Sequence, residues 1–260
     1  MVIKPIMNPH TNSPSEKMQN LTYRLILLML LTVLTACECL AEFTDTDWNL
    51  TFYDNCGFPV TDGEYQSVKW VTNGKNKFLR FELRNGDKGK CSSDDVKRNR
   101  APYWERAEVK QKFILERKKY SLEFEVRFVS GFQGERETFF QIHQYHSGCS
   151  VGPPLMFKAF SQGMLGVFLK QPEGQHFRHF VGPLDIGEWI RFKLIFNTAG
   201  DSEVSLYKNK RIHFEGQPFH IKDCGEPHFK FGIYRPGDDE FGGNTTSIVD
   251  FDKFELKVIN

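Results

Sequence analysis

Strict alternation between apolar and polar residues, repeated in several short stretches, limits what this chain can fold into. In residues 138–144, Phe140 and Ile142 share one side of an extended strand. Gln141 and His143 stand together on the other side. A period of two residues is typical of a half-buried β-strand rather than of a helix. On its own, this stretch fits either an ordinary half-exposed strand or a site that uses an amide and an imidazole side by side.

Two further stretches have the same design and favour a functional site. Their apolar residues alternate with side chains that can bind a carboxylate or move a proton. These polar faces hold Arg106, Glu108 and Lys110 in the first stretch, and His228, Lys230 and Tyr234 in the second. Three strands with one apolar face and one reactive face predict a shared site on the outer surface of a sheet.

The three stretches contain the motifs Arg-x-Glu-x-Lys, Gln-Ile-His and Lys-x-Gly-Ile-Tyr, in that order. Together they resemble the jelly-roll polysaccharide lyases, a group that includes heparin lyase I, glucuronan lyase and the small alginate lyases. The resemblance extends from about Trp104 to Val258. Lys110 stands where alginate lyases usually have a second arginine, and Arg235 follows Tyr234 where they have Asn-Gln. These departures count against alginate as the substrate more than against the fold.

The resemblance implies an all-β fold, a two-sheet antiparallel β-jelly roll of the concanavalin A-like sandwich type with an open substrate groove. The composition agrees, because 25 phenylalanines and short alternating runs between turn residues suit packed sheets. No convincing helix pattern is present, and residues 42–260 are expected to form a single domain. The net charge of +1 gives no indication of a nucleic-acid or membrane partner.

Residues 1–41 are expected to be a signal peptide that is removed. Basic residues precede an apolar run at 25–34 that is too short to span a bilayer, and small residues lead to a cleavage site after Ala41. The protein is therefore expected to be secreted and extracellular. Alternatively, the residues before Cys37 resemble a lipobox, and the chain would be a bacterial lipoprotein acylated at that cysteine.

Two features of the remaining chain fit export. Asn49 and Asn244 each begin an N-glycosylation sequon. The cysteines are even in number, as expected for two disulfides: Cys56, Cys91, Cys149 and Cys224. No close Cys-x-x-Cys pair is present among them, so a zinc site is much less expected.

The pairing of the four cysteines has three possible connectivities. In an antiparallel pair the residue numbers of facing positions add to a constant. If His143 lies opposite Lys230, Cys149 falls opposite Cys224. The family resemblance makes these strands neighbours, although intervening loops could break the register. The expected disulfides are therefore Cys149 with Cys224 and Cys56 with Cys91.

The resemblance implies β-elimination across a 4-linked uronate, with a glucuronan-like polymer favoured as the substrate. The site must neutralise the sugar carboxylate, for which Gln141 and Arg106 are the candidates. His143 is the candidate base because its ordinary pKa lies near neutrality, and Tyr234 is the candidate acid for the departing O4. For glucuronate, Tyr234 alternatively serves as both base and acid while His143 only orients it. The sequence leaves both mechanisms open.

Six further polar residues are assigned to substrate binding: Lys230, Glu108, Lys110, Gln144, Lys158 and Arg235. Lys230 would either favour ionisation of Tyr234 or hold the negative charge of the substrate. The polar stretch between Asp87 and Arg100 is expected to be a long loop tethered at Cys91. Such a loop either flanks the substrate groove or is a solvated excursion.

The alternative function is a non-catalytic, lectin-like module that binds acidic polysaccharide, because this fold hosts many such binders. In both cases the expected partner is an acidic polysaccharide, and the protein is expected to be a monomer. No nucleic acid, no membrane after signal removal, no cofactor and no metal are expected. Formation of a C4–C5 double bond in the polymer would distinguish a lyase from a binder.

Overall fold

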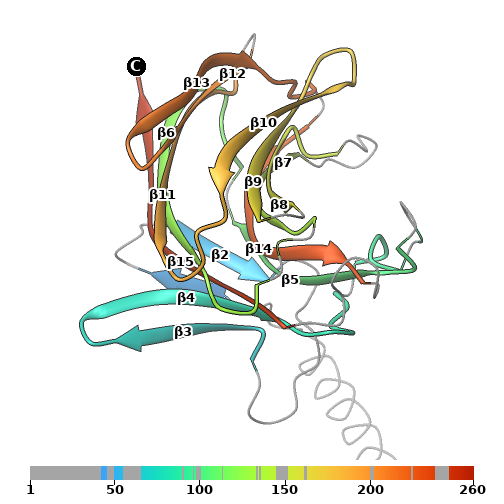
Figure 1. Cartoon of the computed structure of the whole chain (residues 1–260). Coiled ribbons are helices and arrows are strands. Elements are labelled where there is room, and N and C mark those ends of the chain that lie inside the picture. The colour runs from blue at the N-terminus through green and yellow to red at the C-terminus, as the bar shows by residue number, and fades with distance from the viewer. Residues whose placement is uncertain are drawn as a thin grey trace, which may run out of the picture. The chain divides into compact units, whose positions relative to one another are not determined.

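The computed structural model describes residues 42–45, 50–54, 66–89, 91–95, 97, 101–112, 114–132, 134, 136–144, 152–160, 163–199, 202–223, 225–237 and 246–260. These residues belong to one compact unit, Ala41–Asn260. All the regular elements among them are β-strands (Figure 1). The described part of the chain accordingly has no helix that could cross a membrane.

The strands form two sheets, and neighbouring strands pair in antiparallel fashion. The eight-stranded sheet has the order β1 (Glu42–Asp45), β2 (Leu50–Asp54), β5 (Trp104–Gln111), β14 (Pro227–Pro236), β7 (Thr138–Gln144), β8 (Leu155–Phe160), β9 (Met164–Lys170) and β10 (His176–Pro183). The seven-stranded sheet has the order β13 (Arg211–Pro218), β12 (Glu203–Lys208), β11 (Trp189–Asn197), β6 (Lys119–Phe128), β15 (Ser247–Ile259), β4 (Asn76–Leu83) and β3 (Val68–Asn73). The predicted all-β, two-sheet fold is confirmed.

A core rich in phenylalanine joins the two sheets. Phe124 of β6 stacks on Phe140 of β7, with ring centroids 4.8 Å apart. Phe231 of β14 and Phe254 of β15 have centroids 4.5 Å apart. All four side chains are buried, and such pairs stabilise the fold by about 0.5–1.5 kcal/mol beyond their burial. Because each contact crosses between the sheets, the apolar faces predicted from alternation point into the core.

A β-bulge interrupts the alternation in β7. Phe139 and Phe140 both face the core, where they contact Phe128 and Phe124 of β6. The pairing of β7 shifts at this point with both of its neighbours, β14 and β8. Thr138 therefore pairs with Tyr234 on the outer side of the sheet. Bulges often occur beside active sites, where they redirect a side chain.

Arg235, predicted to bind substrate, lies in the interior. Its side chain is fully buried, with Nε donating to Glu105 at 2.6 Å and Nη1 donating to Glu137 at 3.3 Å and to Ser247 at 2.9 Å. Arg235 directly follows the outward-facing Tyr234, and successive side chains of a strand point to opposite faces. The prediction that Arg235 binds substrate is corrected: it is an interior cation that joins β14 to β5 and β15.

Gln144, also predicted to bind substrate, lies on the core side for the same reason. It follows His143 in β7, and its side chain is fully buried. Its Oε1 accepts a hydrogen bond from the backbone N–H of Lys222 at 2.9 Å. The prediction for Gln144 is therefore corrected as well, because this amide cannot reach a substrate on the outer face.

The register between β14 and β7 differs from the expected one by two residues. His143 faces His228, and Gln141 faces Lys230. A shift of two residues keeps each side chain on its own face, so the alternation cannot reveal it. The register argument for pairing Cys149 with Cys224 therefore loses its support.

Several predictions concern residues outside the described ranges. These are the signal peptide at 1–41, the sequons at Asn49 and Asn244, and the cysteines Cys56, Cys149 and Cys224. Cys91 is disulfide-bonded, but both predicted pairings stay predictions.

Replacing Arg235 by Met should lower the free energy of unfolding by about 3–5 kcal/mol, because it leaves the carboxylates of Glu105 and Glu137 buried without their cation. Urea denaturation measures the change. Arg211→Met, at an exposed position of β13, is the matched control and should change stability by no more than about 0.5 kcal/mol. Equal, small losses in both variants would contradict a structural role for Arg235.

Candidate active site

The three predicted strands are neighbours in the eight-stranded sheet, with β14 between β5 and β7. Facing positions form rows across them, and Lys110, Lys230 and Gln141 make one such row. Tyr234 faces Arg106 on one side and Thr138 on the other. The sheet thus brings together seven predicted residues, called here the three-strand site: Arg106, Glu108, Lys110, Gln141, His143, Lys230 and Tyr234.

Arg106 is the buried electrostatic centre of this site. Its Nη1 donates to Glu108 at 2.5 Å, and its Nε and Nη2 donate to the two carboxylate oxygens of Asp94 at 3.1 and 2.7 Å. Gln141 donates from Nε2 to the other oxygen of Glu108. Burial opposes the charge on Arg106, but the carboxylates of Glu108 and Asp94 outweigh this effect and raise its pKa. Arg106 is therefore a permanent, fixed cation.

Asp94 is a site residue that the sequence reasoning missed. It is fully buried, and its backbone carbonyl accepts a hydrogen bond from the N–H of Trp104 at 2.8 Å. The N–H of Arg106 donates to the carbonyl of Asp87 at 3.0 Å, so this loop runs beside the start of β5. Of the two expectations for the loop, flanking the site is the one that its described residues support. A buried arginine needs carboxylate partners, which is the signal that could have identified Asp94.

Tyr234 contacts both a cation and an indole ring. The guanidinium carbon of Arg106 lies 4.1 Å from the centroid of the phenol ring. The ring of Trp104, in β5, stacks on Tyr234 with centroids 4.9 Å apart. Tyr234 itself is only partly buried. The phenol is thus held in place while part of it remains accessible.

His143 and His228 face each other with ring centroids 5.4 Å apart. Burial, followed by the charge of Lys230, lowers the pKa of His143 to about 2. Burial lowers the pKa of His228 to about 4, although its Nδ1 lies 2.9 Å from the carbonyl oxygen of Glu226. Among the described residues, neither Nδ1 of His143 nor Nε2 of His228 has a hydrogen-bond partner. Both imidazoles are therefore neutral at neutral pH.

Two lysines supply positive charge near the surface of the three-strand site. Lys230 and Lys110 are both partly buried and face each other across β14 and β5. Burial lowers the pKa of Lys230 to about 8, while Glu108 opposes this shift. Lys158 is on the same outer face in β8, opposite Thr138, and so lies beside the three-strand site rather than within it.

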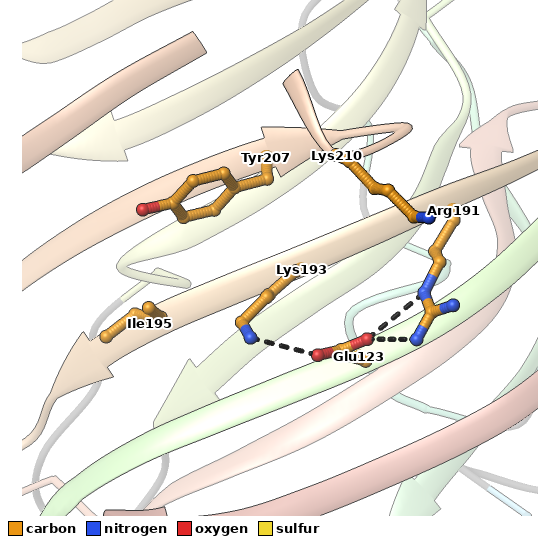
Figure 2. Close-up of a pocket in the computed structure, with 6 residues that line it drawn as sticks. All are labelled: Glu123, Arg191, Lys193, Ile195, Tyr207 and Lys210. Atoms are coloured by element: carbon orange, nitrogen blue, oxygen red, sulfur yellow. Dashed lines mark hydrogen bonds and ion pairs between the residues drawn. The ribbon is translucent and has the colours of Figure 1, made fainter. Parts of the chain in front are cut away.

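A hollow of about 430 Å³ lies elsewhere, on the outer face of the seven-stranded sheet (Figure 2). In this hollow, Glu123 of β6 forms ion pairs with Arg191 and with Lys193, the latter at 3.0 Å. None of the predicted site residues lines it. The carboxylate of Glu123 is therefore already neutralised by two cations. Within the described ranges, no group of three or more His, Cys, Asp or Glu side chains could hold a metal ion.

Comparison of the sequence with known protein families identifies the family of this chain. The sequence model of the family described as polysaccharide lyase matches residues 42–255. The chain belongs to the polysaccharide lyase family. The predicted lyase class is thereby confirmed. A search among curated proteins finds no match.

Solved polysaccharide lyases share the fold. The endo-β-1,4-glucuronan lyase from the fungus Trichoderma reesei is 17% identical, with a TM-score of 0.56 over 78% of this chain and 92% of that chain. An alginate lyase from Pseudomonas aeruginosa is 16% identical, with a TM-score of 0.56 over 75% of this chain and 88% of that chain. At such identities the likeness shows the jelly-roll fold and not the substrate.

The two depressed histidine pKa values predict a loss of stability in acid. Because the pKa of His228 in the folded protein, about 4, lies below its ordinary value of 6.5, the unfolded chain takes up this proton first as the pH falls. The contribution of neutral His228 is complete above about pH 6.5 and is lost at about 1.4 kcal/mol per pH unit toward pH 4.

The variant His228→Asn, which can still donate to the Glu226 carbonyl, should lack this part of the pH dependence. Urea denaturation of both proteins between pH 7 and 4 measures it. The difference between the unfolding free energies of the wild type and the variant should change by about 1.4 kcal/mol per pH unit in that window. Parallel curves would show that His228 is not held neutral in the folded protein.

Proposed function

We propose that this protein cleaves a 4-linked, uronate-containing polysaccharide by β-elimination, with a glucuronan-like polymer favoured. The observation that carries this proposal is the position of Tyr234 beside the fixed cation Arg106, in a site whose accessible charged groups are the cations Lys110 and Lys230. An anionic polymer complements that charge. The fold shared with a glucuronan lyase agrees, and the departures from the alginate-lyase motifs favour glucuronate over alginate.

In the proposed mechanism, the sugar carboxylate lies over the row formed by Gln141, Lys230 and Lys110. Lys230 and Lys110 are the more accessible members, whereas Gln141 and Arg106 are almost fully buried. The cations neutralise the carboxylate, and their effect grows as negative charge spreads from C5 onto it in the transition state. Arg106 contributes its positive charge from below the surface of the site, because its N–H groups already donate hydrogen bonds to Asp94 and Glu108.

Tyr234 carries out both proton transfers in this mechanism. Its phenolate takes the C5 proton, the C4–O4 bond breaks as the C4–C5 double bond forms, and the phenol then returns the proton to O4. A cation fixed beside the ring stabilises the phenolate that this cycle needs. His143, with a pKa of about 2, holds a proton poorly and is assigned the role of a neutral hydrogen-bonding partner.

Removing the phenol hydroxyl tests this assignment. Tyr234→Phe should lower the elimination rate by at least about two orders of magnitude, the usual scale for losing an acid–base group, while polymer binding changes only a few-fold. Ultraviolet absorbance of the new double bond gives the rate, and calorimetry with an oligoglucuronate gives the affinity. Tyr207→Phe, on the seven-stranded sheet, is the matched control and should match the wild type.

The outcomes separate the two functions. Unchanged elimination in Tyr234→Phe would remove this residue from the mechanism. A wild-type protein that binds polyuronates but produces no double bond on any of them would be the lectin-like module instead. For His143, the variant His143→Gln should retain more activity than Tyr234→Phe, because an amide replaces a hydrogen bond but cannot replace a base.

We also propose that the protein is exported, because a polymeric substrate is met outside the cell. Residues 1–41 would be removed as a signal peptide. Sequencing the N-terminus of protein from the culture medium should give Glu42 as the first residue. A membrane-bound product that begins with an acylated Cys37 would favour a lipoprotein. Non-reducing peptide mapping of the same material tests the two disulfide pairings and the glycans at Asn49 and Asn244.

A further inference from the structure

Beyond the three-strand site, the same outer face carries a second group of side chains at the far edge of the sheet. It consists of three aromatic rings and two cations on β8, β9 and β10, called here the aromatic–cationic patch: Phe160, Phe168, Phe180, Lys158 and Arg178. The mechanism above uses none of them for proton transfer.

The patch is assembled by direct contacts among its members. The rings of Phe168 and Phe180 lie 5.3 and 5.6 Å from that of Phe160, measured between centroids. The guanidinium carbon of Arg178 is 4.8 Å from the Phe168 centroid, and the Lys158 Nζ is 5.5 Å from it. A Cβ on Gly166 would come within 2.6 Å of the Phe160 ring, so the missing side chain lets this ring lie over β9.

The charges of the patch are not balanced within the described part of the chain. Neither Lys158 nor Arg178 forms an ion pair with a described residue, although Lys158 is partly buried. Burial, followed by the charges of Arg136 and Arg178, lowers the pKa of Lys158 to about 8. Partial burial of a cation without a counterion is unfavourable, and a bound anion would reduce that cost.

The aromatic part of the patch is accessible. Phe180 is 51% exposed, and Phe160 and Phe168 are only partly buried. Clustered aromatic rings that expose apolar area to water mark binding surfaces. Flat rings next to positive charge suit a sugar ring that carries a carboxylate, because the sugar face packs on the rings while the carboxylate pairs with the cations.

The strand register connects the patch to the three-strand site. One row runs from Lys230 and Gln141 through Met156 and Phe168 to Arg178. A second row runs from Tyr234 and Thr138 through Lys158 and Gly166 to Phe180. With neighbouring strands about 4.8 Å apart, the rows extend roughly 20 Å from β14 to β10. An oligosaccharide covers that distance, and a single sugar does not.

We infer that the aromatic–cationic patch is a binding subsite for uronate residues of the same polymer chain, several sugars away from the bond that is cleaved. This inference rests on the proposed function for the identity of the polymer. It assigns Phe168 and Phe180 to stacking on sugar rings, and Lys158 and Arg178 to pairing with sugar carboxylates. It also implies that long chains bind better than short ones.

Direct binding tests the subsite independently of catalysis. The wild type and the variants Phe180→Ala and Arg178→Gln are titrated with oligoglucuronates of increasing length by calorimetry. Each variant should weaken binding of a hexasaccharide at least about fivefold, and the weakening should diminish as the oligosaccharide is shortened. Ile212→Ala and Arg211→Gln are the matched controls, because they make comparable changes at exposed positions of β13 and should bind like the wild type.

The possible outcomes distinguish the subsite from the proposed function. If the wild type cleaves polyuronates and the patch variants bind and cleave long chains like the controls, the subsite is refuted and the lyase assignment stands. If the wild type binds without cleaving and the patch variants bind long chains more weakly, the subsite stands and the lyase assignment fails. A wild type that binds no polyuronate would refute both. Equal weakening in Arg178→Gln and Arg211→Gln would also refute the subsite, because it would reflect net charge alone.

Discussion

The alternation along β14 is the constraint on which the rest of the structure depends. Phe229, Phe231 and Ile233 fill the core between the sheets, so Lys230 and Tyr234 must point outward. Because β14 lies between β5 and β7, the same parity fixes which side chains of both neighbours join them. Burial of the apolar face, at about 25 cal/mol per Å² of apolar area, thus positions reactive groups that come from three distant parts of the chain.

On the outer side of the eight-stranded sheet, the buried cation of Arg106 imposes a second constraint, because it needs carboxylate partners. Arg106 is 5% exposed, and an arginine at that depth is stable only with carboxylates at hydrogen-bonding distance. Glu108 comes from its own strand, whereas Asp94 has to be brought by the loop before β5. The loop is therefore tied to the site by the charge that it neutralises. In return, the network holds the guanidinium against the ring of Tyr234.

The sequence predicted the sheets, the three strands and, except for Gln144 and Arg235, the sides that their residues occupy, because parity and apolar character decide these features. It did not predict the register of β7 against β14, since a shift of two residues preserves every face and changes only which residues meet. The bulge at Phe139 and Phe140 was also missed, because strict alternation assumes a regular strand and places adjacent residues on opposite faces.

The errors for Gln144 and Arg235 have a different origin. Each was grouped with a site residue by adjacency in the sequence, although adjacent residues of a strand lie on opposite faces. For Arg235, the interior position is possible only because Glu105 and Glu137 are buried with it, and a local motif does not show partners so far away in sequence. Asp94 was missed for a similar reason, because a loop residue has no periodicity to place it.

The charge of the outer face also bears on which group moves the proton. An acidic polymer favours a surface with several cations, and the charges of Lys230, Arg106 and Lys110 all act on His143. The same cations, added to burial, make a charged imidazolium unfavourable, so a histidine in this position is a poor proton carrier. A tyrosine responds in the opposite sense, because its ionised form is an anion that nearby cations stabilise. In the proposed mechanism this charge distribution favours Tyr234 over His143 for the proton transfers, and His143 is assigned to hydrogen bonding as a neutral imidazole.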